Sequence, residues 1–242
     1  MTRAKLRFDI LTLFPNFFKT PLEESLLGKA IKSGLIDVET HNIRDFGTGK
    51  HKAVDDRPFG GGPGMVLKPD VLASSLKSAV KESKNQNTSP YIVMLDPAGT
   101  PLTQRKVAEL AKKRHIILIC GHYEGVDERF KRKYVDEEIS IGDYVLSGGE
   151  PAALVIIDSA SRLIPDFMNK EESANQESFQ FTKIEGKKLQ LLDYPVYTRP
   201  EIFEGEAVPK ELIGGNHDEI KNWRLQESVK KTRIKRPDLS KE

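Results

Sequence analysis

Short apolar segments alternate with amphipathic ones through the first two thirds of the chain. The apolar segments are β-branched and bounded by Gly, Pro or polar residues, which predicts strands over 6–14, 36–43, 91–95, 116–120 and 138–141. Between them, apolar residues recur at helical spacing and predict helices over 22–31, 71–80, 103–113 and 151–163. Thr103 is a suitable N-cap for its helix. This alternation favours an α/β domain with a mostly parallel sheet.

Three of the predicted strands run directly into turns rich in glycine or proline. Asp96-Pro97-Ala98-Gly99 follows the third strand, residues 121–125 follow the fourth, and the fifth is followed by Gly142 and Ser147-Gly148-Gly149. Ligands of open α/β sheets bind beyond the carboxyl ends of the strands. The three turns therefore predict one shared pocket. A further long loop, 45–69, contains five glycines between 49 and 64, and loops of this length are usually functional or disordered.

The character of the chain changes after Leu163. Residues 165–180 are polar and read as a linker, and 208–235 carries helical patterns interrupted by Gly214-Gly215-Asn216. Basic residues gather there, which suits a polyanion such as RNA, although a solvated helix face would look the same. They are Lys221, Arg224, Lys230, Lys231, Arg233, Lys235 and Arg236.

Composition narrows the class of protein only a little. The 242 residues are 38% hydrophobic with a formal net charge of +2, which permits one core and a small second domain. Cys120 is the single cysteine, so no intramolecular disulfide forms, which fits a reducing, cytoplasmic compartment. The N-terminus does not read as a signal peptide, and no apolar run approaches the roughly 20 residues of a membrane span, so we expect no membrane association.

Several common catalytic motifs are missing from the sequence. The segment around Gly47-Thr48-Gly49-Lys50 lacks the first glycine and the Ser or Thr of a phosphate-binding loop. The chain also contains no G-x-G-x-x-G, H-E-x-x-H or G-x-S-x-G. These absences argue against most dehydrogenases, zinc enzymes and hydrolases.

Five long blocks in order resemble the bacterial tRNA (guanine-N1)-methyltransferases, the TrmD family of the SPOUT superfamily. They are RPFGGGPGM (57–65), CGHYEGVDER (120–129), SIGDYVLSGGE (140–150), YTRPE (197–201) and GGNHDEIKNWR (214–224). The resemblance implies a SPOUT-type parallel sheet with a deep trefoil knot in residues 1–166, a flexible linker over 167–181 and a small, mainly helical tRNA-binding domain over 182–242. It also implies a homodimer with a shared active site. The implied reaction is methylation of the guanine immediately 3′ of the anticodon of tRNA, with S-adenosylmethionine as donor.

The family resemblance places the cofactor among the three strand-end turns. The implied cofactor-binding residues are Leu95, Asp96, Pro97, Gly121, Tyr123, Glu124, Gly125, Ile141, Gly142, Asp143, Tyr144, Val145, Leu146, Gly148 and Gly149. Glycines there would let the backbone approach the ligand, although each fits an ordinary tight turn as well. Asp96, Ala98 and His122 depart from the residues more usual in the family, which are Ser, Gln and Arg.

Guanine N1 carries a proton, so its methylation requires a general base, and the charge that spreads onto O6 favours a nearby cation. The family's block around the proposed Asp base resembles Ser173 to Phe179, where Glu177 stands in place of Asp. We predict Glu177 as the base, unless it only orients the guanine. Arg162 is the candidate for O6, or a partner of Asp158 on its own helix. Glu124 would position Arg162 or help bind Mg²⁺, for which the sequence offers no metal cage.

The tRNA would be held by the 57–65 loop and the basic C-terminal module. The candidate tRNA-binding residues are Asp56, Arg57, Gly64, Arg199, Lys221 and Arg224. Asp56 would pair with a guanine edge, or with Arg57 locally. Trp223 would stack on a base, although a lone Trp in a helical module is more often core.

Three other functions remain open at this stage. A knotted methyltransferase with another target, a non-catalytic RNA-binding protein and a metabolic nucleotide-binding enzyme would each share part of these features. The departure at Glu177 is what favours the non-catalytic alternative, and the absent nucleotide motifs weigh against the metabolic one.

Overall fold

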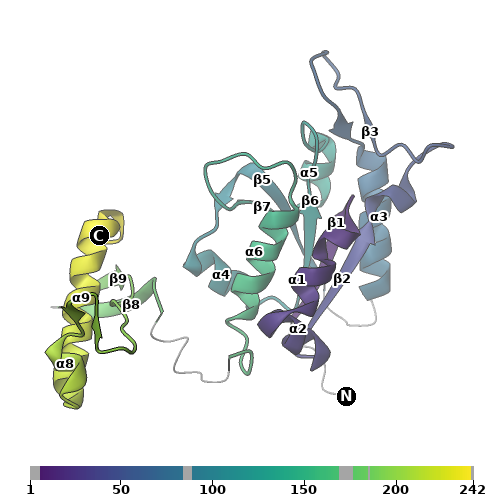
Figure 1. Cartoon of the computed structure of the whole chain (residues 1–242). Coiled ribbons are helices and arrows are strands. Elements are labelled where there is room, and N and C mark those ends of the chain that lie inside the picture. Colours follow the sequence, from purple (N-terminus) through teal and green to yellow (C-terminus); the bar gives the residue numbers. More distant parts are fainter. Residues whose placement is uncertain (1–5, 84–88, 169–176, 185, 241–242) are drawn as a thin grey trace. The chain divides into compact units, whose positions relative to one another are not determined.

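The computed structural model describes residues 6–83, 89–168, 177–184 and 186–240 (Figure 1). The chain divides into two compact units, Met1–Asn169 and Lys170–Glu242. Most of the predicted linker, from 169 to 176, lies outside the described residues, and its last two positions belong to a strand of the second unit.

The first unit is built on a five-stranded, fully parallel sheet in the order β2-β1-β6-β5-β7. This confirms the predicted α/β class. The strands are β1 (Leu6–Thr12), β2 (Ile36–Asn42), β5 (Tyr91–Pro101), β6 (His115–Cys120) and β7 (Glu137–Ser140). β1 and β6 are buried along their whole length, which explains their nearly continuous apolar sequences.

Helices cover both faces of this sheet (Figure 1). Leu6, Phe8 and Ile10 of β1 point into one core, while Leu11 and Leu13 point into the other, as the alternation of a strand requires. The first core is closed by η1 (Pro15–Phe18), α2 (Ser25–Lys32), α4 (Gln104–Leu110) and α6 (Glu150–Ser161). The second core is closed by η2 (Ile43–Phe46), α3 (Pro69–Ser83) and α5 (Glu128–Tyr134).

The sequence correctly predicts the start of one helix but not the course of another. Thr103 caps α4 by accepting a hydrogen bond from Lys106 N–H, as predicted. The helix predicted over 22–31 is wrong in its continuity, because α1 (Lys19–Glu23) ends at an extended Glu24 before α2 begins. A Cβ atom at Gly28 would lie 2.2 Å from the Glu23 carbonyl oxygen, so the break depends on a close approach that only glycine permits.

The long loop between η2 and α3 contains two short strands, β3 (Asp55–Asp56) and β4 (Val66–Leu67), which pair antiparallel. Glycine-rich residues 60–64 lie between them. The predicted long loop therefore contains a hairpin, which extends beyond the sheet at the top of Figure 1.

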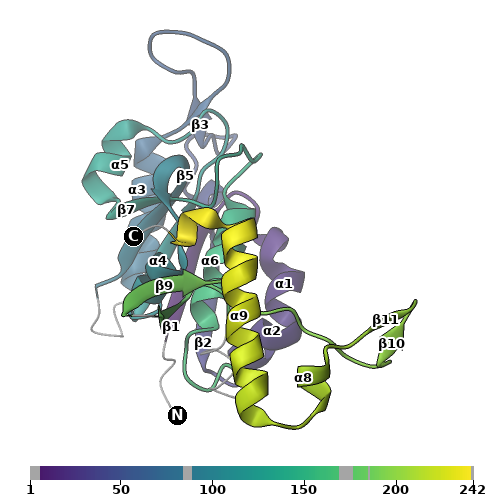
Figure 2. The ribbon, with the colours of Figure 1, turned by 90° about the vertical axis from the view of Figure 1, so that its left-hand side faces the viewer.

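The second unit combines helices with two antiparallel hairpins (Figure 2). β8 (Gln180–Ile184) pairs with β9 (Lys187–Leu191), and β10 (Ile202–Phe203) with β11 (Glu206–Ala207). The helices are α8 (Lys210–Ile213), α9 (His217–Lys235) and η4 (Pro237–Ser240). Sequence analysis predicted its helical patterns but not these hairpins. Within the described part of the chain, no helix is both long and apolar enough to span a bilayer.

Candidate active site

A cavity of about 330 Å³ lies at the carboxyl ends of β5, β6 and β7. The three predicted turns meet there, since parallel strands end at the same edge of a sheet. The lining residues that were predicted are Leu95, Asp96, Pro97, Gly121, Tyr123, Glu124, Gly125, Ile141, Gly142, Tyr144, Val145, Leu146, Gly148 and Gly149. Asp143 is exposed and is absent from the lining. The lining residues that were not predicted to bind the cofactor are Met94, His122, Ile139, Ser140, Ser147 and Ala152.

The backbone of this pocket depends on close approaches at two glycines. A Cβ atom on Gly99 would lie 2.5 Å from the backbone of β7, at the bulge where both Leu95 and Thr100 pair with Ile139. A Cβ atom on Gly149 would lie 2.7 Å from Cys120 Cα. A larger residue at Gly99 would push the turn after β5 away from β7, and one at Gly149 would push the start of α6 away from the end of β6.

Tyr123 is the strained residue of the second turn. Its φ is +60°, a left-handed conformation that is uncommon outside glycine and is concentrated at functional sites. The side chain is 48% exposed at the pocket wall. The turn therefore holds an aromatic ring at the cavity at a conformational cost.

The third turn contributes an apolar wall. Tyr144, Val145 and Leu146 line the cavity while remaining 54%, 87% and 41% exposed. The Tyr144 hydroxyl donates a hydrogen bond to Ile141 O at 3.2 Å. Exposed apolar side chains beside a cavity suit a flat, partly apolar ligand such as a nucleoside.

Glu124 connects this pocket to the glycine-rich hairpin. Its N–H donates to Met65 O at 2.9 Å, and Leu67 N–H donates to Gly125 O at 3.0 Å. A Cβ atom on Gly64 would lie 2.3 Å from the Glu124 side chain. The structure thus brings together a predicted catalytic residue and a predicted tRNA-binding residue.

Comparisons with known proteins identify the family. The model of the family described as tRNA (Guanine-1)-methyltransferase TrmD matches residues 6–242. Proteins named tRNA (guanine-N(1)-)-methyltransferase are 47% identical in Dictyoglomus turgidum, over 97% of this chain and 89% of that one, and 48% identical in Clostridioides difficile, over 98% of both. The chain belongs to this methyltransferase family. A methyltransferase of this family acts on tRNA with S-adenosylmethionine as methyl donor.

The predicted catalytic residues do not all lie at the methyltransferase pocket of the first unit. Glu124 lines the cavity, but Arg162 is the C-cap of α6, which begins at the cavity and spans 12 residues. At 1.5 Å per residue, Arg162 lies about 18 Å along the helix axis from the pocket end. Glu177 belongs to the second unit, where it lies three residues before the first residue of β8.

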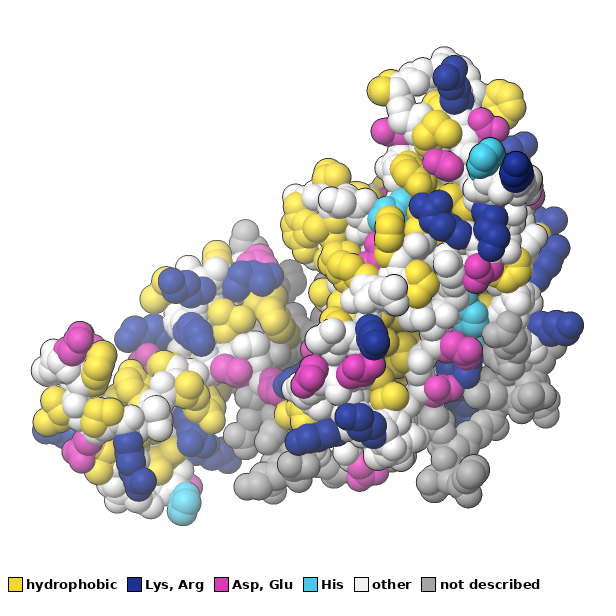
Figure 3. Space-filling view, turned by 45° about the vertical axis from the view of Figure 1, so that its right-hand side comes forward, with side chains coloured by type: hydrophobic (Ala, Val, Ile, Leu, Met, Phe, Trp, Pro, Cys, Tyr) yellow, Lys and Arg dark blue, Asp and Glu magenta, His cyan; other side chains and the backbone are white. Residues whose placement is uncertain are grey.

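The predicted tRNA-binding residues occur in both units. Asp56 and Arg57 are exposed at the hairpin of the first unit, and Asp56 Oδ1 accepts from Arg57 N–H at 2.8 Å. Arg199 and Lys221 are exposed in the second unit, whose visible face carries many Lys and Arg side chains (Figure 3). The Arg224 guanidinium instead lies 4.7 Å from the centre of the Tyr194 ring.

Trp223 is partly buried and packs edge-on against Tyr197, with ring centroids 6.1 Å apart. This contact favours the interpretation of Trp223 as part of the core of the second unit. Tyr197 is 50% exposed and is the aromatic ring of this pair that is open to a ligand.

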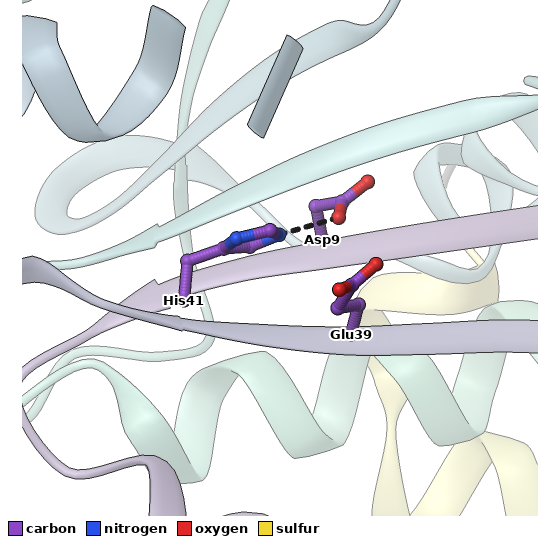
Figure 4. A group of neighbouring side chains, drawn as sticks. All are labelled: Asp9, Glu39 and His41. Atoms are coloured by element: carbon purple, nitrogen blue, oxygen red, sulfur yellow. Dashed lines mark hydrogen bonds and ion pairs between the residues drawn. The ribbon is translucent and has the colours of Figure 1, made fainter. Parts of the chain in front are cut away.

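Asp9, Glu39 and His41 are potential metal ligands that lie close together on the sheet face covered by α3 (Figure 4). Asp9 is fully buried, and its oxygens accept hydrogen bonds from His41 and His115 at 2.6 Å and from two Arg7 nitrogens at 2.7 and 2.8 Å. Arg7 also pairs with Asp37 and Glu39. The guanidinium therefore occupies the place of a cation, and this network does not fit a metal site without displacing Arg7.

Burial alone would raise the pKa of Asp9, but the hydrogen bonds from His115, His41 and Arg7 outweigh it and hold the pKa well below its usual range. Burial raises the pKa of the Cys120 thiol, and the nearby Glu150 carboxylate adds to this effect. Cys120 is therefore an inert core residue, which agrees with a methyl transfer that needs no covalent nucleophile.

Proposed function

We propose that this chain transfers the methyl group of S-adenosylmethionine to N1 of the guanine immediately 3′ of the anticodon in tRNA. The observation that carries the proposal is the cavity itself. It gathers three turns, from β5, β6 and β7, and these turns contain the residues that the family resemblance assigns to the cofactor. Its size is at the lower end of the range of small-molecule sites, about 300–1,000 Å³.

The pocket residues would bind the cofactor mainly through backbone and apolar contacts. When bound, the cofactor supplies an electrophilic methyl group on a sulfonium. Ile141 and Leu146 would cover the adenine, and backbone groups of the 121–125 and 141–149 turns would read its edge. Leu95, Asp96 and Pro97 would line the remaining side. The protein's task is to align the methyl group with the attacking nitrogen and to exclude water.

Glu177 accepts the N1 proton of the guanine in this mechanism. Deprotonation makes N1 nucleophilic, and a carboxylate within hydrogen-bond reach of N1 can serve as the base. As the proton leaves, negative charge develops on O6, and the Arg162 guanidinium stabilises it. Glu124 orients Arg162 or holds Mg²⁺ near the pocket, where one carboxylate with water molecules is a usual magnesium environment.

The positions of Arg162 and Glu124 support an active site shared between two subunits. Arg162 is at the far end of α6 from the pocket that contains Glu124. In a homodimer, Arg162 and Glu177 of one copy would complete the pocket of the other, as a two-fold interface allows. We also propose that the first unit contains the trefoil knot that membership of this family implies.

The second unit and the glycine-rich hairpin would hold the tRNA. Exposed Lys221, Arg199 and Arg57 would contact phosphates, and Tyr197 offers a ring for stacking. The substrate and the single cysteine both fit a cytoplasmic enzyme.

Single-turnover methyl transfer tests this proposal. Transcripts with G or A after the anticodon are incubated with wild type and with Glu177→Gln. Transfer to the G transcript alone, lost in Glu177→Gln, supports both the reaction and the base. Transfer that survives Glu177→Gln moves the base elsewhere. No transfer by the wild type, with Mg²⁺ present and cofactor bound, contradicts the proposed reaction.

A further inference from the structure

Glu150 is a buried carboxylate beside the cavity that the proposed mechanism does not use. It is the first residue of α6, and only 3% of it is exposed. His122 Nε2 lies 2.9 and 2.8 Å from its two carboxylate oxygens, and the Thr12 hydroxyl donates to Oε1 at 2.6 Å. Because a carboxylate only accepts hydrogen bonds, His122 carries its proton on Nε2.

The His122 ring lies between the second and third turns of the pocket. The His122 backbone forms an isolated antiparallel β-bridge with Gly148, and a Cβ atom on Gly148 would lie 2.2 Å from the imidazole ring. Next to this contact, Gly149 N–H donates to Gly121 O at 3.0 Å. The ring therefore packs directly on the end of the 141–149 segment, whose middle forms the exposed apolar wall of the cavity.

The same network reaches the end of β1. Thr12 Oγ1 accepts from Phe14 N–H at 2.9 Å, and the Phe14 ring contacts His122 with centroids 5.1 Å apart. Glu150 thus joins β1, the turn after β6 and the start of α6 through charged and neutral hydrogen bonds. Burying a carboxylate is costly unless such partners compensate, so the donors around Glu150 are fixed in place.

We propose that Glu150 is a positioning residue for cofactor binding, which acts by fixing the His122 ring beneath Gly148. The proposal rests on the proposed function, in which this cavity holds the cofactor. Without the His122–Glu150 hydrogen bonds, the ring would turn, the 141–149 segment would lose its support, and the apolar wall would no longer be held against the adenosine. The tRNA-binding surfaces would be unaffected.

Two substitutions of His122 form a matched test. Gln places its amide nitrogen about where Nε2 lies and can still donate to Glu150, whereas the Asn side chain is one bond shorter. S-Adenosylhomocysteine affinity is measured by calorimetry for wild type, His122→Gln, His122→Asn and Glu150→Gln. Methyl-transfer kinetics, tRNA affinity and melting temperature are measured on the same proteins.

We expect His122→Asn and Glu150→Gln to weaken S-adenosylhomocysteine binding about tenfold, the size expected for losing a hydrogen bond to a charged group. The KM for S-adenosylmethionine should rise similarly, while kcat at saturating cofactor and tRNA affinity stay close to wild type. His122→Gln should retain most of the affinity. Equal affinities in the Asn and Gln variants, or a lower melting temperature with unchanged cofactor affinity, would overturn the proposal.

The titration requires no turnover, so the two proposals fail in different ways. A wild type that binds S-adenosylhomocysteine but methylates no tRNA contradicts the proposed reaction and leaves the role of Glu150 testable by affinity. If the wild type methylates tRNA normally and His122→Asn binds S-adenosylhomocysteine as tightly as the wild type, only the role of Glu150 is contradicted.

Discussion

Gly64 lies directly against the side chain of Glu124, with no room for a Cβ atom between them. The contact joins the glycine-rich hairpin to the turn after β6. It means that a loop expected to touch tRNA and a residue expected to act in catalysis share one surface.

Gly64→Ala should therefore lower methyl transfer more than Gly60→Ala does. Both glycines have positive φ, +82° and +89°, so both substitutions carry similar backbone strain, about 1–2 kcal/mol. Only the alanine at position 64 also displaces Glu124, because nothing lies within 4 Å of a Cβ atom on Gly60. The measurement is kcat/KM for tRNA in both variants. Equal losses would show that strain, and not Glu124, is responsible.

Gly149→Ala should weaken cofactor binding by a purely steric effect. Gly149 has a φ of −79°, which any residue adopts, but its Cβ atom would meet Cys120 Cα at 2.7 Å. Overpacking of this kind costs about 1–3 kcal/mol, equivalent to roughly a 5- to 160-fold loss of affinity if it falls on the pocket. Gly214→Ala is the control, since its closest neighbour would be 3.6 Å away. Calorimetry with S-adenosylhomocysteine compares the two, and unchanged affinity in Gly149→Ala would show that the turn adapts.

The buried Arg7–Asp9 network should make stability depend on acid pH. Because the folded-state pKa of Asp9 is held below its unfolded value, its stabilisation is complete above about pH 4 and is lost as the pH falls further. Asp9→Asn should lower the free energy of unfolding at pH 7 by about 3–5 kcal/mol, since it leaves Arg7 without its buried partner. It should also flatten the acid limb of the stability curve, which denaturant titrations at several pH values would reveal.

A surface pair supplies the control for this measurement. Glu128→Gln removes a partner of Arg132 at side chains that are 55% and 78% exposed, so stability should hardly change. An Asp9→Asn variant as stable as Glu128→Gln would contradict the structural role of the network.

Mixing two inactive variants tests whether the active site is shared. Arg162→Ala removes the proposed O6 cation, and Leu146→Glu blocks the cavity at a residue that is 41% exposed and therefore tolerant of charge. If Arg162 acts in the partner's pocket, dissociated and remixed subunits should regain about a quarter of wild-type activity, since half the dimers contain one intact site. Mixtures as inactive as the separate variants would place Arg162 and the pocket in one subunit.

The sequence by itself determined the class of the first unit and most of its pocket. A short apolar run rich in isoleucine, such as 116–120, indicates a buried strand, and a turn rich in glycine or proline after each of three parallel strands places those turns at one edge. The Thr103 N-cap was equally readable, because capping is a local interaction.

Tertiary structure alone decided what these turns contact. Gly64 against Glu124, Gly149 against Cys120 and His122 on Glu150 pair residues distant in sequence, and no periodicity encodes such contacts. The break at Glu24 is a local feature, but the helical spacing of the apolar residues does not encode it either, because it depends on the close approach of Gly28 to the Glu23 carbonyl. His and Glu side chains are common on protein surfaces, where such a pair would have little effect. His122 and Glu150 instead lie largely buried beside a cavity, and a buried carboxylate needs its hydrogen-bond partners, so that the proposed positioning role follows from the tertiary structure.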